Sequence, residues 1–228
     1  MNLDCTKKHD VINRALLLCG IAMAPLFNIV LYAQIATRTS FDVLRVPLSL
    51  LSLGEFGWVQ ITNFITTGLL AIAGAVGIKG KLEAGFGRAL GPFFIAMFGL
   101  GLIAAGAFHP DAALGFPPGT PPGPAPTQSL HSNLHTAAFA WIMLSLVAAC
   151  GVLSARFAKR GETSWSAYSA ITALAVPIFV ATAFSTNVWL INTLVAAFGY
   201  GWISLLSWKV LSRGDHRRRK DLSYARAG

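Results

Sequence analysis

The sequence has 228 residues, of which 54% are hydrophobic and only 12% are charged. A soluble domain carries about a quarter charged residues, so this composition excludes an ordinary water-soluble fold and indicates a chain covered largely by lipid. The net charge of +9 does not indicate a nucleic-acid partner, because the basic residues lie in short stretches between apolar runs, as in proteins whose membrane orientation they set.

Six apolar stretches are long enough to cross a bilayer, which takes about 20 predominantly apolar residues. Their ranges are 14–36, 59–78, 89–108, 133–155, 166–185 and 188–210. The first stretch could instead be a signal peptide, but its apolar part exceeds the usual signal core of about 7–15 residues. We therefore expect an all-α integral membrane bundle of six transmembrane helices, folded as one domain over residues 1–228.

The basic residues predict an orientation for this bundle. All but two of the 18 Lys and Arg lie before or at the start of the first stretch, between the second and third, between the fourth and fifth, or at the end of the sixth and beyond it; the two exceptions are Arg38 and Arg45. Under the positive-inside rule those four segments are cytoplasmic, so both termini are expected in the cytoplasm. Membrane lipids are the expected partners. The basic tail at 211–228 could bind anionic lipid headgroups, or it could serve only to fix the topology.

Two outer loops carry the irregular parts of the sequence. The loop at 37–58 contains the apolar run 46–54, which is unlike a solvated loop and too short to span, so we expect a re-entrant or interfacial segment there. The loop at 109–132 is rich in Pro and Gly over 115–124, and proline excludes helix and central strand from that stretch. This stiff segment could be a lid over the outer face or a simple spacer.

Three stretches of the chain carry a family resemblance. They are PLSLLSLGEFGW at 47–58, GAFHPD at 106–111, and GFPPGTP at 115–121 running on to LHSNLH at 130–135. In order and spacing they resemble the bacterial membrane family called domain of unknown function 998. The resemblance implies a multi-span protein of the bacterial cytoplasmic (inner) membrane and implies no particular activity.

Histidines and one acid gather at the outer ends of the third and fourth stretches. They are His109, Asp111, His131 and His135, and the last two are four residues apart, a spacing with which one helix face presents two imidazoles to a metal. The four side chains could hold zinc, with Asp111, His131, His135 and Ser49 taking part in catalysis through a metal-bound water. Alternatively, they only cap helix ends and bind interfacial water, and the pattern leaves both interpretations open.

Amide and hydroxyl side chains lie at the same outer depth on several other stretches. These residues are Asn28, Tyr32, Gln60, Asn63, Thr67 and Asn192. They could line an outward-open cavity that holds a substrate, or they could join neighbouring helices by hydrogen bonds.

Three functions are compatible with these features. The first is a metal-dependent hydrolase of a lipid or other amphiphile, and the second is a protein that binds or transports a lipid or small molecule in the same cavity. The third is a structural membrane partner without a ligand. The sequence shows no phosphate loop, dinucleotide fingerprint or haem-attachment motif, and it does not decide whether the protein is an enzyme.

Overall fold

The computed structural model describes the backbone of residues 2–227 and the side chains of residues 8–214. The long helices of this part are α1 (Asn2–Thr37), α2 (Gly57–Lys81), α3 (Leu90–Ala107), α4 (Leu130–Lys159), α5 (Thr163–Thr186) and α7 (Gly201–Ala227). The short elements are η1 (Leu48–Ser52), α6 (Ile191–Val195) and the π-helical turn η2 (Ala196–Tyr200). Six helices of the described residues are long and apolar enough to cross a membrane, the sixth being the run from α6 into α7. The expected all-α, six-span fold is confirmed.

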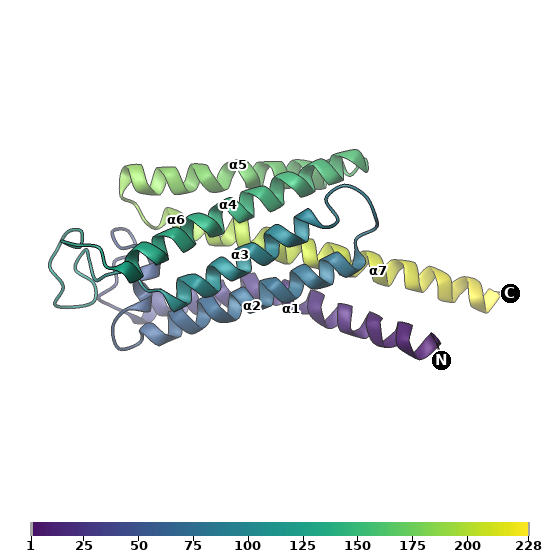
Figure 1. Ribbon diagram of the computed structural model, residues 1–228, viewed down its shortest axis with the longest axis horizontal. Helices are drawn as coiled ribbons and strands as arrows, with labels where there is room; N and C mark the ends of the chain where they lie inside the picture. Colours follow the sequence, from purple (N-terminus) through teal and green to yellow (C-terminus); the bar gives the residue numbers. More distant parts are fainter. Residues whose placement is uncertain (1, 228) are drawn as a thin grey trace.

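Helices that follow one another in the chain pack side by side, and α7 returns to α1 to close the bundle (Figure 1). Glycines allow the closest of these approaches. A Cβ atom on Gly68 would lie 2.5 Å from the carbonyl oxygen of Gly99, and one on Gly74 would lie 2.7 Å from the Cα of Gly20. These pairs hold α2 tightly against α3 on one side and α1 on the other, as small residues do between membrane helices.

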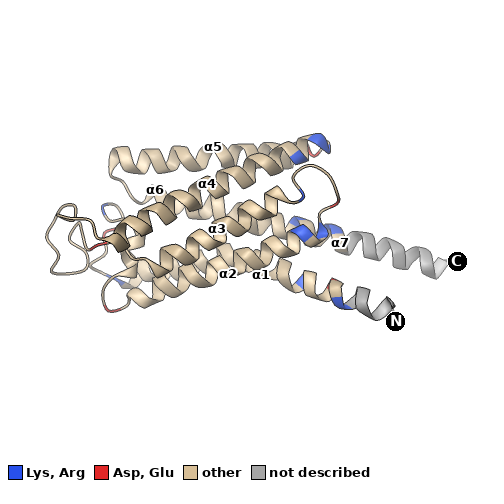
Figure 2. Ribbon diagram, viewed as in Figure 1, with Lys and Arg blue, Asp and Glu red and all other residues tan. Residues whose placement is uncertain are grey.

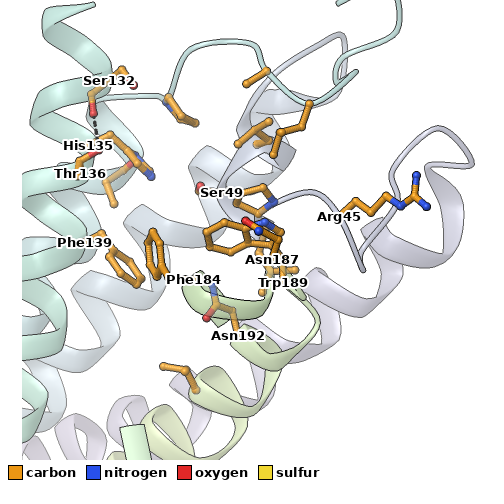
Figure 3. A pocket seen from close by; sticks show the side chains of 18 of the residues that line it. Arg45, Ser49, Ser132, His135, Thr136, Phe139, Phe184, Asn187, Trp189 and Asn192 are labelled. Carbon is orange, nitrogen blue, oxygen red and sulfur yellow. Dashed lines mark hydrogen bonds between the residues drawn. The ribbon is translucent and has the colours of Figure 1, made fainter. Parts of the chain in front are cut away.

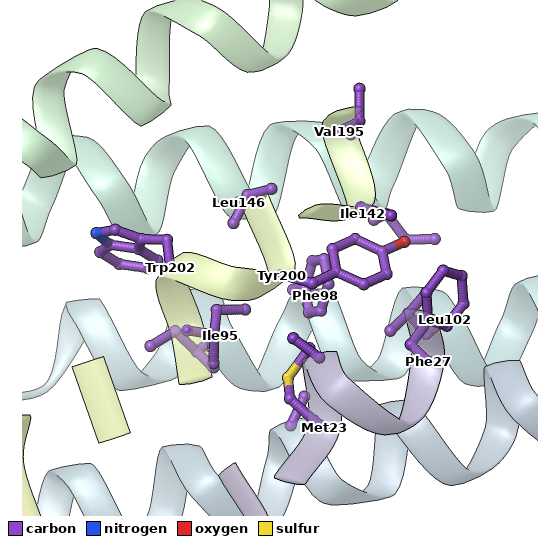
Figure 4. Close-up of a cluster of buried hydrophobic side chains, with 14 of the residues drawn as sticks. Met23, Phe27, Ile95, Phe98, Leu102, Ile142, Leu146, Val195, Tyr200 and Trp202 are labelled. Carbon is purple, nitrogen blue, oxygen red and sulfur yellow. The ribbon is translucent and has the colours of Figure 1, made fainter. Parts of the chain in front are cut away.

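The centre of the bundle is a cluster of buried apolar side chains (Figure 4). The Tyr200 ring meets the rings of Phe27 and Phe98 edge to face, with centroid distances of 4.8 and 5.0 Å. Such edge-to-face contacts between aromatic rings are favourable beyond the area they bury. The cluster therefore joins α1, α3 and the π-helical turn of the sixth span into one core.

The two ends of the bundle differ in charge. Lys and Arg gather at the end where both chain termini lie, whereas the opposite end is built from the long loops (Figure 2). The positive-inside rule makes the first of these the inner end and the second the outer end, and we use those names. The orientation itself and the identity of the membrane stay predictions. The basic tail at 211–228 lies mostly outside the residues whose side chains are described.

An acidic residue ties the inner ends of α5 and α7 together. Glu162, directly before α5, accepts hydrogen bonds from Lys209 at 2.6 Å and from Arg213 at 2.7 Å. The Lys209 ammonium also lies 4.4 Å from the centre of the Trp165 ring, and its side chain is only 8% exposed. Burial alone would raise the pKa of Glu162, but the hydrogen bonds from Arg213 and Lys209 hold that pKa below its ordinary value.

Among the described residues, hydrogen bonds to neighbouring helices hold α5 at its inner half. There Ser154 and Ser166 exchange hydrogen bonds of 2.9 and 3.0 Å with each other's carbonyls, and Trp202 donates to Ser169 at 3.0 Å. Pro177 follows in mid-helix, where it removes one backbone donor. Beyond it, the hydroxyl groups of α5 donate to carbonyls of α5 itself. The outer half is thus held to the bundle mainly by apolar contacts.

The two outer loops pack on the outer end. Segment η1 buries Leu50 and Leu51, and the Arg38 guanidinium donates to the Leu51 carbonyl at 2.7 Å. The Pro-rich loop folds back on itself and buries Phe116, whose ring meets Phe41 of the first loop edge to face at 5.2 Å. The two loops, residues 38–56 and 108–129, therefore form one layer over the outer end, which we call the roof. The depth of η1 relative to the lipid stays a prediction.

Candidate functional site

A cavity of about 1060 Å³ lies beneath this roof at the outer end (Figure 3). Its lining comes from α4, α5, α6 and the two loops, and three further lining residues, Phe27, Ile142 and Tyr200, belong to the core cluster. Pockets for small molecules span roughly 300–1,000 Å³, so this cavity is large enough for a ligand with a long apolar part.

The lining of the cavity is mostly apolar with a few polar groups. The apolar lining includes several aromatic side chains, among them Phe139, Phe184 and Trp189 (Figure 3). The polar lining includes Ser49, Asp111, Ser132, His135, Thr136 and Asn192. A cavity of this composition suits a molecule that has both an apolar and a polar part.

His135 is held in one orientation by the end of a neighbouring helix. Its side chain is buried, and Nδ1 lies 2.7 Å from the Phe108 carbonyl oxygen and 3.1 Å from the Ala105 carbonyl oxygen. The last carbonyls of α3 have no partner within that helix, so they accept this bond. Because carbonyls only accept, Nδ1 carries the proton, and the neutral ring keeps Nε2 as an acceptor. The ring points into the cavity (Figure 3).

Asn192 brings a second acceptor to the same cavity. It lies in the first turn of α6, and its backbone N–H donates to the Trp189 carbonyl at 2.9 Å. Its side-chain Oδ1 is buried, and it has no hydrogen-bond partner among the described residues. A buried amide oxygen without a partner is unfavourable, so a small rotation of the Asn192 amide that brought Oδ1 to a donor in the cavity would be stabilising.

Asp111 lines the cavity, but its carboxylate already accepts hydrogen bonds from Ser129. Its carboxylate accepts from the backbone N–H and the hydroxyl of Ser129, both at 2.7 Å, and Ser129 in turn caps α4 by accepting from Ser132 N at 3.1 Å. The hydrogen bonds from Ser129 hold the pKa of Asp111 below its ordinary value. The carboxylate thus stabilises the start of α4, where negative charge is favourable.

The four residues expected to bind zinc do not converge. The rings of His109 and His131 lie 5.0 Å apart, but neither residue lines the cavity. His135 is turned toward the end of α3 and Asp111 toward Ser129. Residues 8–214 contain no group of three or more His, Cys, Asp or Glu placed to hold a metal ion. The arrangement gives the zinc prediction no supporting donor set.

The amide and hydroxyl residues expected to line the cavity mostly lie elsewhere. Of the six, only Asn192 lines it, while Tyr32 is 47% exposed on the outside of the bundle. Gln60 accepts from Gln34 at 2.7 Å and from Asn63 at 3.4 Å, and Asn63 also donates to the Phe27 carbonyl at 3.2 Å. This arrangement corresponds to the alternative of helix-joining hydrogen bonds between α1 and α2. Neither Thr67 nor Asn28 lines the cavity either.

Sequence reasoning missed several lining residues. Thr136, Phe139 and Ile142 follow Ser132 and His135 at helical spacing, so they share one face of α4. That periodicity was the available signal. The lining residues Phe184 and Trp189 carry no comparable signal, because their place depends on how α5 and α6 turn back over the cavity.

A family model described as "protein of unknown function (DUF998)" matches residues 21–209. The matched region contains all the residues that line the cavity. No curated protein and no solved structure matches the chain.

Proposed function

The chain belongs to the DUF998 family, whose description assigns no activity, and we propose that it binds an amphiphilic molecule in the outer cavity. The observation that carries this proposal is the composition of the cavity. Its depth is formed by apolar side chains of the core, whereas hydrogen-bonding groups such as His135 and Asn192 face it from the outer parts of α4 and α6.

The apolar part of the cavity supplies the driving force for such a ligand. Burial of apolar surface contributes about 25 cal/mol per Å² removed from water, so an acyl or isoprenoid chain would gain most of its affinity there. A small polar metabolite would meet few partners among Phe139, Phe184 and Met143, which lie on the walls. The surrounding membrane lipids are the nearest source of amphiphiles.

Binding has better support than hydrolysis. Ser49 and His135 both line the cavity, but no hydrogen bond joins them in the described part of the chain. A nucleophilic serine needs an adjacent base within about 2.6–3.2 Å, and that base needs an orienting partner. Asp111, the nearest candidate for a catalytic carboxylate, is bonded to Ser129. Retention or transfer of the ligand therefore fits the geometry better than its cleavage.

The test compares two variants that add the same bulk in different places. Ala196 lines the cavity, whereas Ala181 is exposed on α5 and does not line it. Wild type, Ala196→Phe and Ala181→Phe would be purified in detergent, and their bound amphiphiles extracted and quantified by mass spectrometry. We expect near-stoichiometric amphiphile in wild type and Ala181→Phe, and severalfold less in the monodisperse, helical fraction of Ala196→Phe. Some loss of stability is expected in Ala196→Phe, because Ala196 is only 4% exposed and belongs to the core cluster. Equal amounts in all three proteins, or none in wild type, would contradict the proposal.

A further inference from the structure

We propose that the ligand is an uncharged amphiphile whose headgroup donates hydrogen bonds, as the hydroxyl groups of an acylglycerol do. Its donors would meet His135 Nε2, and a small rotation of the buried Asn192 amide, whose residue lines the same cavity, would bring its Oδ1 within reach of a second donor. This inference rests on the proposed function and deepens it by naming the chemical class of the headgroup.

The first acceptor is fixed by the backbone. Both oxygens beside His135 Nδ1 are carbonyls, so the Nδ1 proton stays directed at the end of α3. A ring flip would break both of these contacts. His135 is only 6% exposed, and the hydrogen bonds that its ring makes to described residues both involve Nδ1. A ligand group that reaches Nε2 must therefore supply a proton.

The second acceptor is independent of the first and comes from a different span. Asn192 Oδ1 is buried without a partner among the described residues. Because an unpaired buried acceptor is unfavourable, a donor placed against it gains more than a donor in water. A hydroxyl group serves well here, since it can donate to either acceptor and still accept from Ser132 or Asn187, which line the same cavity.

The charges around the cavity argue against an ionic headgroup. Arg45 is the one Lys or Arg among the described residues that line it, and its side chain is 86% exposed and 3.7 Å from Asp42. A phosphate in the interior would therefore lack a buried counter-charge, which makes its desolvation costly. An ammonium group would find the Asp111 carboxylate already bonded to Ser129. An uncharged headgroup avoids both penalties.

Three probes with the same oleoyl chain separate these possibilities. They are 1-monooleoylglycerol, which has hydroxyl donors, methyl oleate, which has none, and oleoyl lysophosphatidic acid, which adds a phosphate. Each would be titrated into the purified full-length protein in detergent and its binding measured by native mass spectrometry. Since one or two hydrogen bonds separate the first two probes, we expect 1-monooleoylglycerol to bind roughly tenfold more tightly than either of the others.

Two cavity variants test whether His135 and Asn192 cause this preference for 1-monooleoylglycerol. In His135→Phe and in Asn192→Leu the preference for 1-monooleoylglycerol over methyl oleate should fall to roughly threefold or less. The matched controls His131→Phe and Asn28→Leu change the same residue types outside the cavity and should keep it. His135→Phe also loses the contact with α3, so Asn192→Leu provides the second reading if that variant does not fold.

The outcomes distinguish this inference from the proposed function. Equal binding of all three probes, or tightest binding of lysophosphatidic acid, would overturn the donor-headgroup inference and leave amphiphile binding intact. A preference that persists in both cavity variants would also overturn it. Absence of binding by every probe to the wild-type protein would remove the proposed function as well.

Discussion

Replacement of Glu162 by Gln should weaken the inner end of the bundle by a measurable amount. The carboxylate pairs with Lys209, whose side chain is 8% exposed, and with Arg213, whose side chain is 54% exposed. Removing one partner of a buried ion pair costs about 3–5 kcal/mol, and solvent around Arg213 lowers this to about 2–3 kcal/mol here. For a protein of this length the melting temperature should fall by about 5–10 °C.

The same variant makes a prediction about pH. The pKa of Glu162 lies below its ordinary value in the folded protein, so its contribution is fully present above the unfolded pKa of about 4.3. That contribution is lost as pH falls through the folded pKa. Thermal unfolding in detergent should therefore show a constant difference between wild type and Glu162→Gln at pH 6–8 and a shrinking one below about pH 4.3. The control is Glu55→Gln in an exposed loop. A difference below about 1 °C at pH 7, or one that persists unchanged at pH 3, would refute the reasoning.

Four further predictions concern packing and dynamics. Gly68→Leu should lower the free energy of unfolding by about 1–3 kcal/mol or more, measured as a fall in melting temperature, because its side chain would meet the Gly99 carbonyl; a stable variant would contradict the close packing of α2 and α3. Asn63→Leu should cost about 0.6 kcal/mol by thermal unfolding and leave amphiphile binding unchanged, since it removes hydrogen bonds to Phe27 and Gln60 and does not line the cavity. Ser129→Ala should cost about 1 kcal/mol through the lost cap of α4, whereas Ser129→Thr should restore most of it. Hydrogen exchange in detergent should be faster over 178–186 than over 163–172, and equal rates would contradict the one-sided fastening of α5.

The six spans could be predicted from the sequence because a bilayer requires about 20 apolar residues in each helix, and that requirement acts locally. The start of α4 was also within reach, since Ser129 is a favourable N-cap residue and Leu130 is the first helical residue. The outer position of the site followed from the placement of His135 and Asn192, and both residues do line the cavity.

The sequence could not show that the four zinc candidates would fail to converge, because their positions depend on competition for each polar atom. The sequence correctly places His135 at the outer end of the bundle. Its Nδ1, however, is hydrogen-bonded to the free carbonyls at the end of α3. The direction in which the amide side chains of α2 point could not be predicted from the sequence for a related reason. Gln60 and Asn63 share a face of α2, and only the packing of the whole bundle decides that this face meets α1 instead of the cavity.

The uneven fastening of α5 makes the cavity responsive to its surroundings. A beam clamped at one end bends under a sideways load, and the unclamped outer half of α5 presents Ile178, which is 60% exposed. Pressure from the acyl chains would press the unclamped part toward α4, and a thinner or looser bilayer would relax it. The width of the cavity would then depend on the membrane as well as on the protein, and affinities for the proposed amphiphile measured in micelles should differ from those in vesicles.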